Sequence, residues 1–137
     1  MLDHTDMQIL DELSKNSRIT MKKLGEKVHL TGQSTAARVA KLEEKGVIEG
    51  YTIKENQVKL GCLIHAWITI HTKSTHHQPY LSYTKTQEKY VINNFKISGA
   101  GCYLLECKFP SNEVLEQFLT DLNKHVTYEL STVINKL

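Results

Sequence analysis

Residues 20–46 read TMKKLGEKVHLTGQSTAARVAKLEEKG, the stretch with the clearest structural signal in the chain. Thr20 is a suitable N-cap for one helix, and Thr31 can cap a second helix after a short turn. Gly46 stands where a left-handed C-cap glycine would end the second helix. Two helices joined by a tight turn are typical of a helix-turn-helix, in which the second helix enters the major groove of DNA.

The residues around this stretch extend it to a winged helix-turn-helix domain over residues 1–53. Asp3 is a candidate N-cap for a first helix, which the turn at Asn16–Arg18 ends. Residues 47–53 alternate between apolar and polar side chains, which predicts a short strand that would serve as the wing.

The apolar period changes after a polar linker at residues 54–61. The pattern then predicts, in order, a strand at 62–71, a helix from Pro79 to about Glu88, strands at 91–98 and 102–109, a helix capped by Ser111 and a strand at 129–134. The order strand, helix, strand, strand, helix, strand is that of the ferredoxin-like α+β sandwich. We therefore expect such a βαββαβ domain over residues 62–137.

Composition excludes several classes of protein. Of the 137 residues, 40% are hydrophobic and 23% are charged, as in ordinary globular domains. No apolar run approaches the roughly 20 residues of a membrane-spanning helix, and no secretory signal is visible. The three cysteines have no CxxC spacing, which argues against a zinc knuckle or a disulfide framework and favours a reducing cytoplasm.

Charge is distributed unevenly along the first domain. Residues 18–41 hold six basic side chains and one acidic side chain, whereas residues 1–17 hold four acidic and one basic. On a helical wheel of residues 32–45, one side is apolar and the other offers Gln, Ser, Ala and Lys, the residue types that suit base edges and phosphates. The candidate DNA-contacting residues are Thr20, Lys22, Lys23, Thr31, Gln33, Ser34, Ala37, Arg38 and Lys41.

Explanations that do not involve DNA remain open for these residues. The basic block, and Gln33, Ser34 and Lys41 in particular, would also suit a plain solvated helical face. Arg38 would alternatively pair with Asp11 or Glu12 and hold the first helix, and both roles are compatible.

Three motifs then match a known family. They are Leu2-Asp3-x-x-Asp6-x-x-Ile9-Leu10-x-x-Leu13, Ser17-Arg18-Ile19-Thr20-Met21-x-x-Leu24, and Arg38-Val39-x-x-Leu42-Glu43-x-x-Gly46-Val47-Ile48-x-x-Tyr51. With this spacing the chain resembles the Lrp/AsnC, or feast/famine, transcription regulators over nearly its whole length. The resemblance implies promoter binding, an effector-sensing sandwich domain of the RAM type, homodimers that often stack into octamers, and response to an amino acid.

The chain departs from the family pattern at two positions. The family often has Gly-x-x-Asp before the third sandwich strand, near its amino-acid pocket, and here the candidate effector-binding turn is Gly99-Ala100-Gly101-Cys102. A neutral thiol at Cys102 does not supply the charge of a carboxylate, and the turn would equally suit an ordinary hairpin. Gly32 stands where the family commonly has Pro, which loosens the helix-turn-helix turn.

The remaining reactive or bulky side chains have structural interpretations. Cys102 fits a buried structural thiol better than a redox switch, and Trp67 fits the core or a dimer interface. The seven histidines, which include the adjacent pair His76-His77, lack metal spacing, so neither a metal nor a cofactor is expected.

Three functions follow from these patterns. The first is a sequence-preferring transcription regulator of the Lrp/AsnC type, for which a small amino acid is the candidate effector. The second is an architectural protein that wraps or bridges DNA without an effector. The third, an enzyme, has no nucleophile–base pair, paired carboxylates or phosphate loop to support it.

Overall fold

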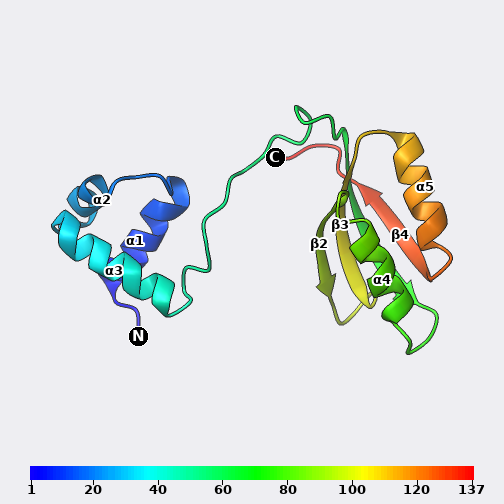
Figure 1. The fold of residues 1–137 in the computed structure, drawn as a ribbon, viewed down its shortest axis with the longest axis horizontal. Helices are drawn as coiled ribbons and strands as arrows, with labels where there is room; N and C mark the ends of the chain where they lie inside the picture. The colour runs from blue at the N-terminus through cyan, green and yellow to red at the C-terminus, as the bar shows by residue number, and fades with distance from the viewer. The chain divides into compact units, whose positions relative to one another are not determined.

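Three helices build the first unit of the computed structural model, which describes all of residues 1–137 (Figure 1). They are α1 (His4–Lys15), α2 (Met21–Val28) and α3 (Gly32–Glu44). Each begins at its predicted N-cap, because the side chains of Asp3, Thr20 and Thr31 accept hydrogen bonds from backbone amides of the first turn. The buried residues of this unit are Ile9, Leu13, Leu24, Val28, Val39 and Leu42.

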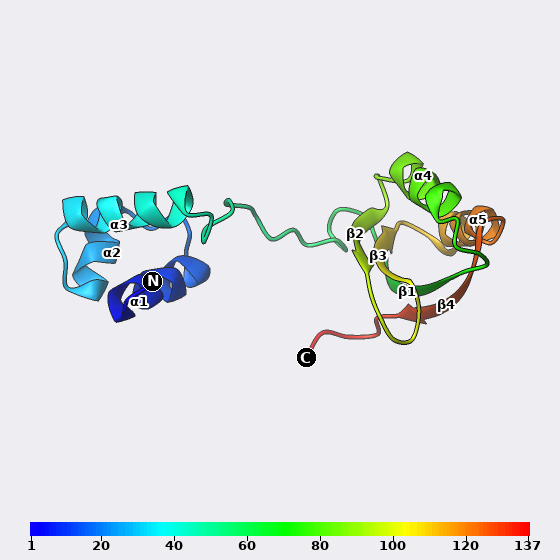
Figure 2. The ribbon, with the colours of Figure 1, turned by 90° about the horizontal axis from the view of Figure 1, so that it is seen from below.

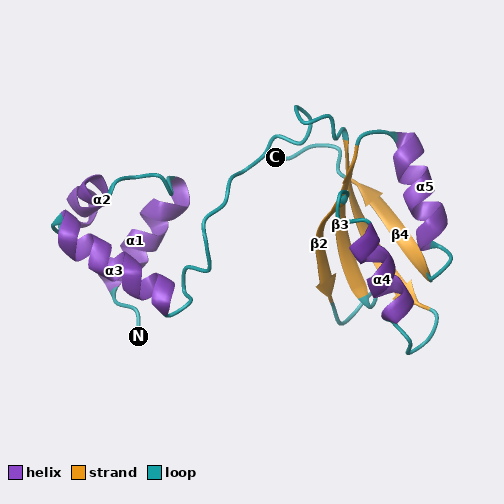
Figure 3. Ribbon diagram, viewed as in Figure 1, coloured by secondary structure: helices purple, strands orange, loops and turns teal.

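The predicted strand at residues 47–53 does not form. These residues carry no regular secondary structure and are drawn as a loop in Figure 3. Gly46, at φ 74°, ends α3 as expected, and backbone hydrogen bonds tie Val47 and Ile48 to Leu42. An alternating sequence becomes a strand only when a neighbour accepts its backbone hydrogen bonds, and no other segment of the chain pairs with this one.

The second unit is the expected ferredoxin-like sandwich. Its elements are β1 (Ile64–Thr72), α4 (Gln78–Thr86), β2 (Val91–Lys96), β3 (Tyr103–Phe109), α5 (Asn112–Leu122) and β4 (Val126–Thr132). The sheet has the order β2-β3-β1-β4, and every neighbouring pair is antiparallel. Contacts divide the chain into Met1–Lys54 and Glu55–Leu137.

The two faces of the sheet differ. Helices α4 and α5 cover one face (Figure 2), where Ile68, Ile70, Leu105 and Phe118 are buried. The other face carries no helix of this unit (Figure 2). The half-buried Trp67 lies on that face, because its neighbours Ala66 and Ile68 point into the core and side chains alternate along a strand. Trp67 therefore lies outside the core, which leaves the interface interpretation.

The last strand begins three residues before its expected start and ends two residues earlier than expected. β4 pairs with β1 from Val126 opposite Thr72 to Thr132 opposite Ala66. The position of β1 therefore sets where β4 starts and stops. None of the helices is long and apolar enough to span a bilayer.

Candidate nucleic-acid interface and sensing turn

Helix α3 exposes the side chains that the sequence predicts to contact DNA. Its inward side is Thr35, Val39 and Leu42, all buried. Gln33, Ser34, Ala37 and Lys41 are exposed. A helix with an exposed amide, a hydroxyl, a small alanine and a cation on one side offers base-edge donors and acceptors together with a phosphate partner.

The start of α2 adds two further cations. Lys22 and Lys23 are exposed in its first turn, and neither they nor Lys41 form an ion pair within the chain. An unpaired cation near the free amides of a helix N-terminus favours an anion such as phosphate. Lys15 and Lys27, by contrast, are held by carboxylates of α1.

Two of the predicted contact residues have structural tasks in the chain. Thr20 Oγ1 accepts a hydrogen bond from the Lys23 amide at 3.2 Å, and Thr31 Oγ1 accepts one from the Ser34 amide at 3.1 Å. Thr31 Oγ1 also donates to Ser34 Oγ at 3.0 Å. Their hydroxyls therefore fix the starts of α2 and α3, the two ends that would face DNA.

The angle between α2 and α3 depends on Gly25, which the sequence patterns did not single out. A Cβ atom there would stand 2.5 Å from the carbonyl oxygen of Leu30 and 2.9 Å from Thr35 Oγ1. The signal was available, since glycine inside a helix costs about 1 kcal/mol relative to alanine and so needs a packing reason. Gly32 is less tightly confined, because its Cβ would meet Lys22 Cα at 3.4 Å.

Arg38 pairs with acids of α1, but not with the two that the sequence suggested. Its Nη1 lies 2.8 and 2.7 Å from the two carboxylate oxygens of Asp3 and 3.1 Å from Asp6 Oδ1. Asp11 and Glu12 pair instead with Lys15 and Lys27. These hydrogen bonds hold the pKa of the Asp3 carboxyl below its usual value and raise the pKa of Arg38.

The turn Gly99–Cys102 joins β2 to β3 as a hairpin, as expected. Gly99 has φ 124°, a conformation that side chains disfavour. Gly101 packs closely on β1, because a Cβ atom there would stand 2.7 Å from Thr69 Cγ2 and 2.9 Å from the Ile70 carbonyl oxygen. The Cys102 amide donates to the same carbonyl at 2.7 Å, so the turn is fixed against β1.

Cys102 is half-buried in a chain of polar side chains, and is not the buried thiol expected. Its sulfur lies 3.4 Å from Thr72 Oγ1, which in turn lies 3.2 Å from His77 Nε2. The other ring nitrogen of His77 lies 2.9 Å from the Tyr103 hydroxyl. Hydrogen bonds from Thr72, with a smaller contribution from the charge of Lys96, lower the pKa of the Cys102 thiol. The buried thiol of this domain is Cys107.

The uncovered face of the sheet has apolar and polar parts. Phe95 of β2 is 48% exposed there, and Trp67 of β1 lies on the same face, with β3 between the two strands. His65 Nε2 lies 2.7 Å from Glu106 Oε2, and Asn93 donates to Glu106 Oε1 at 2.9 Å. A face with large rings and internally paired polar groups resembles the buried part of a protein interface.

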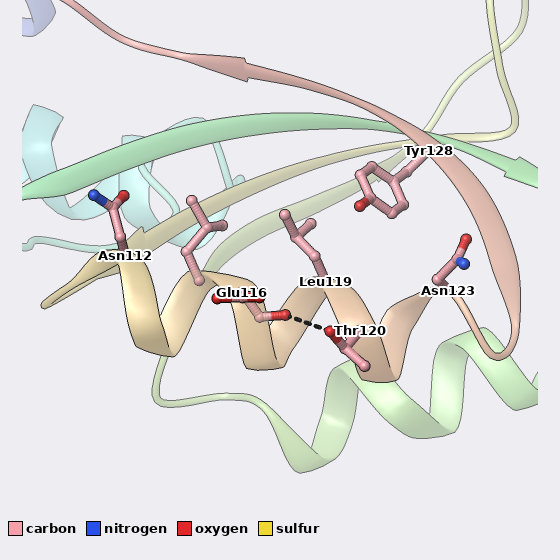
Figure 4. Close-up of a pocket in the computed structure, with 7 residues that line it drawn as sticks. Asn112, Glu116, Leu119, Thr120, Asn123 and Tyr128 are labelled. Carbon is pink, nitrogen blue, oxygen red and sulfur yellow. Dashed lines mark hydrogen bonds between the residues drawn. The ribbon is translucent and has the colours of Figure 1, made fainter.

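A groove of about 480 Å³ opens between α5 and β4 (Figure 4). Leu119 and Tyr128 face it, and Asn112, Glu116 and Asn123 surround it. Thr120 donates a hydrogen bond to the backbone carbonyl of Glu116 at 2.9 Å. None of the residues Gly99–Cys102 lines this groove, so it is separate from the predicted effector turn. No three His, Cys, Asp or Glu side chains cluster as a metal site.

An outward-facing second helix on a helix-turn-helix, followed by a ferredoxin-like sandwich, defines a DNA-binding regulator with a separate second domain. Residues 2–49 match the family model described as winged helix-turn-helix DNA-binding. The chain is 65% identical to the HTH-type transcriptional regulator LrpA of Bacillus subtilis (strain 168), over 99% of this chain and all of that protein.

Solved structures agree with this match. The B. subtilis LrpC structure has a TM-score of 0.92 at 30% identity and covers 100% of this chain and 97% of that one. A feast or famine regulatory protein of M. tuberculosis, complexed with L-methionine, has a TM-score of 0.90 at 24% identity and covers 99% and 94%. The chain belongs to the Lrp/AsnC family of transcription regulators, which are not enzymes.

Proposed function

We propose that this chain is a sequence-preferring transcription regulator that binds double-stranded DNA as a homodimer through α3. The observation that carries the proposal is the exposed side of α3, where Gln33, Ser34, Ala37 and Lys41 stand clear of the core. Lys22 and Lys23 supply phosphate contacts from α2, and Thr20 and Thr31 hold both helix starts. Gln33 and Ser34 address base edges, while Lys41 addresses a phosphate.

The open face of the sheet is the proposed pairing surface. Trp67 and Phe95 are its rings, and burial of such a face in a symmetric dimer would remove them from water. A dimer brings two copies of α3 into one assembly, so the DNA site is expected to contain two half-sites. The family resemblance extends the proposal to an octamer of stacked dimers. The three free cysteines suit the reducing cytoplasm in which such a regulator works.

The Gly99–Cys102 turn is the proposed effector site, with a small amino acid as the ligand. Relatives of this fold include a protein solved with L-methionine. The turn of this chain lacks a carboxylate, but the lowered pKa of the Cys102 thiol gives it more anionic character than a free cysteine has. A partly anionic sulfur would attract the ammonium group of an amino acid at the position where the family often has an acid.

The competing function is architectural, namely wrapping or bridging of DNA without an effector. The observation that favours it is again the missing carboxylate at Cys102. The two functions differ in sequence preference and in response to amino acids, and a single experiment separates them.

That experiment is a fluorescence-anisotropy titration of the full chain against the duplex upstream of its own gene and against a random duplex of equal length. It is run at two salt concentrations, with and without mixed amino acids. A regulator binds its own duplex more tightly, and an amino-acid shift identifies the sensor role. Equal affinity for both duplexes that falls steeply as salt is raised supports the architectural function. No binding to either duplex rejects both functions.

Two variants locate the reading face in the same titration. Loss of one phosphate contact lowers the slope of log affinity against log salt by about 0.9, so Lys41→Ala is expected to reduce this slope. Gln33→Ala is expected to reduce the preference between duplexes and to leave the slope unchanged. Unchanged affinity and unchanged preference in both variants would contradict this placement of the DNA contacts.

A further inference from the structure

We infer that Arg38 is a positioning residue, which fixes α3 against the start of α1 through Asp3 and Asp6, and does not itself bind a DNA phosphate. The inference rests on the proposed function, because it concerns how the DNA-reading helix is held. We call the three side chains of Arg38, Asp3 and Asp6 the clamp.

The clamp joins parts of the chain that are far apart in sequence. Arg38 lies in the middle of α3, and Asp3 is the N-cap residue of α1. Asp3 and Asp6 already form a capping box, in which each side chain accepts a hydrogen bond from the backbone amide of the other. The two carboxylates are therefore held in place before Arg38 reaches them.

Charge argues against a phosphate contact at this position. One guanidinium faces two carboxylates, so the clamp carries a net charge of −1 when all three groups are ionised. A phosphate that approached Arg38 would meet this negative charge. Lys22 and Lys23 carry no acidic partner and lie on α2. Lys41 lines a small hollow together with Arg38 but forms no ion pair, so it is the free cation that a phosphate would meet there.

Packing explains why α3 needs such a restraint. Val39 and Leu42 bury the inner side of the helix, but apolar contacts are non-directional and permit small rotations and shifts. Charged hydrogen bonds of 2.7 to 3.1 Å from one guanidinium nitrogen have a defined direction. Lys41 follows Arg38 by about one turn and Ser34 precedes it by about one turn, so the clamp sets the orientation of the residues that read DNA.

The test uses the full chain and the same pair of duplexes. Arg38→Met is expected to reduce the preference for the chain's own duplex severalfold, with the salt slope unchanged. Asp3→Asn and Asp6→Asn are expected to give the same loss, since Asn at position 3 keeps the N-cap acceptor and removes only the charge. The Asp3→Asn/Arg38→Met pair is expected to lose less than the sum of the single losses.

Two controls accompany these variants. Asp11→Asn removes a carboxylate of α1 that pairs with Lys15 and not with α3, so it is expected to leave preference and slope unchanged. Arg38→Lys keeps the positive charge and replaces the one contacting guanidinium nitrogen by an ammonium with three donors, so its preference is expected to lie between those of the wild type and Arg38→Met, at an unchanged slope. Far-UV circular dichroism confirms that each variant is folded.

Several results would overturn the inference. A fall of about 0.9 in the salt slope of Arg38→Met, as for Lys41→Ala, would show that Arg38 binds a phosphate. Tighter binding with a steeper slope in Asp3→Asn or Asp6→Asn would show that the acids restrain a DNA-binding arginine. Failure of the proposed function looks different, because then the wild-type chain itself binds the two duplexes equally or binds neither, and the clamp is rejected with it.

Discussion

Gly25 of α2 faces Thr35 of α3 so closely that a methyl group on the glycine would stand 2.9 Å from the threonine hydroxyl oxygen. Thr35 is fully buried and donates its hydroxyl to the Thr31 carbonyl at 2.8 Å. The backbone of α2 at Gly25 therefore packs directly against the side chain of Thr35 in α3. The hydrogen bond from Thr35 to Thr31 holds the start of α3 at the same place.

Gly25→Ala is expected to destabilise the first unit, although alanine ordinarily favours a helix over glycine by about 1 kcal/mol. The new methyl group would lie 2.5 Å from the Leu30 carbonyl oxygen in the turn and 2.9 Å from Thr35 Oγ1 of α3, so the turn and the start of α3 must shift away from α2. Such overpacking costs about 1–3 kcal/mol. Thermal unfolding measures the loss, with Gly50→Ala as the control because nothing lies within 4 Å of a Cβ there. A variant as stable as the wild type would show that α2 and α3 accommodate the methyl group with no loss of stability.

Gly101→Ala is expected to destabilise the second unit for a related reason. Its methyl group would collide with Thr69 Cγ2 at 2.7 Å and with the Ile70 carbonyl oxygen at 2.9 Å. Adding Thr69→Ser removes the first of these contacts, so the double variant is expected to recover part of the lost stability. Chemical denaturation measures both. Absence of any recovery would place the strain on the backbone of β1 alone.

Helix starts could be predicted from the sequence, because an N-cap is a local interaction. Asp3, Thr20, Thr31 and Ser111 all cap the helices that follow them. Strand ends are set by neighbours, which is why β4 begins three residues before its expected start and why residues 47–53 form no strand in the single chain.

The candidate site divides in the same way. Exposure of Gln33 and Lys41 follows from helical periodicity, and the wheel placed them correctly. The partners of Arg38 depend on how α1 and α3 cross. The spacing of residues along a single helix carries no information about that crossing. The sequence therefore suggested Asp11 or Glu12, whereas the structure gives Asp3 and Asp6. The close approach at Gly25 was missed for the same reason.

Stability of the first unit is expected to fall at acidic pH in a way that depends on Asp3. Its carboxyl has a pKa below the ordinary 3.8 in the folded chain, chiefly because Arg38 donates hydrogen bonds to it. Its contribution is therefore present above the unfolded-state pKa and is lost as pH falls through the folded-state pKa. Unfolding free energies of wild type and Asp3→Asn, measured between pH 6 and about pH 2, should converge at the acidic end. A constant gap across this range would mean that the ion pair contributes nothing.

The cysteines are expected to differ sharply in alkylation. The pKa of Cys102 is lowered by hydrogen bonds from Thr72, whereas burial raises the pKa of Cys107 to about 12. Only the thiolate attacks iodoacetamide, so the folded chain should be labelled at Cys102 well before Cys107. Peptide mass spectrometry gives both rates, and Thr72→Val should slow only the former. Equal rates at the two positions would contradict the structure.

Dimer formation is expected to change the emission of Trp67, the single tryptophan of the chain. Its ring lies half-buried on the open face of the sheet, so pairing of that face should shift the emission to shorter wavelength as the protein concentration rises. Leu104→Glu places a charge on the same face, next to Phe95 in the strand register, and should keep the chain monomeric. Sedimentation velocity run in parallel gives the oligomeric state. A dimer with unshifted emission would place the interface elsewhere.

The position of the clamp has a practical consequence for work with this chain. Asp3 lies two residues from Met1, and Met1 and Leu2 line the same small hollow as Arg38 and Lys41. A purification tag fused to the amino terminus would bring new charges and a new backbone into that hollow. The carboxyl terminus offers a safer fusion point, because Leu137 is fully exposed and belongs to the other unit. Affinities measured with amino-terminally tagged protein would report the tag together with the regulator.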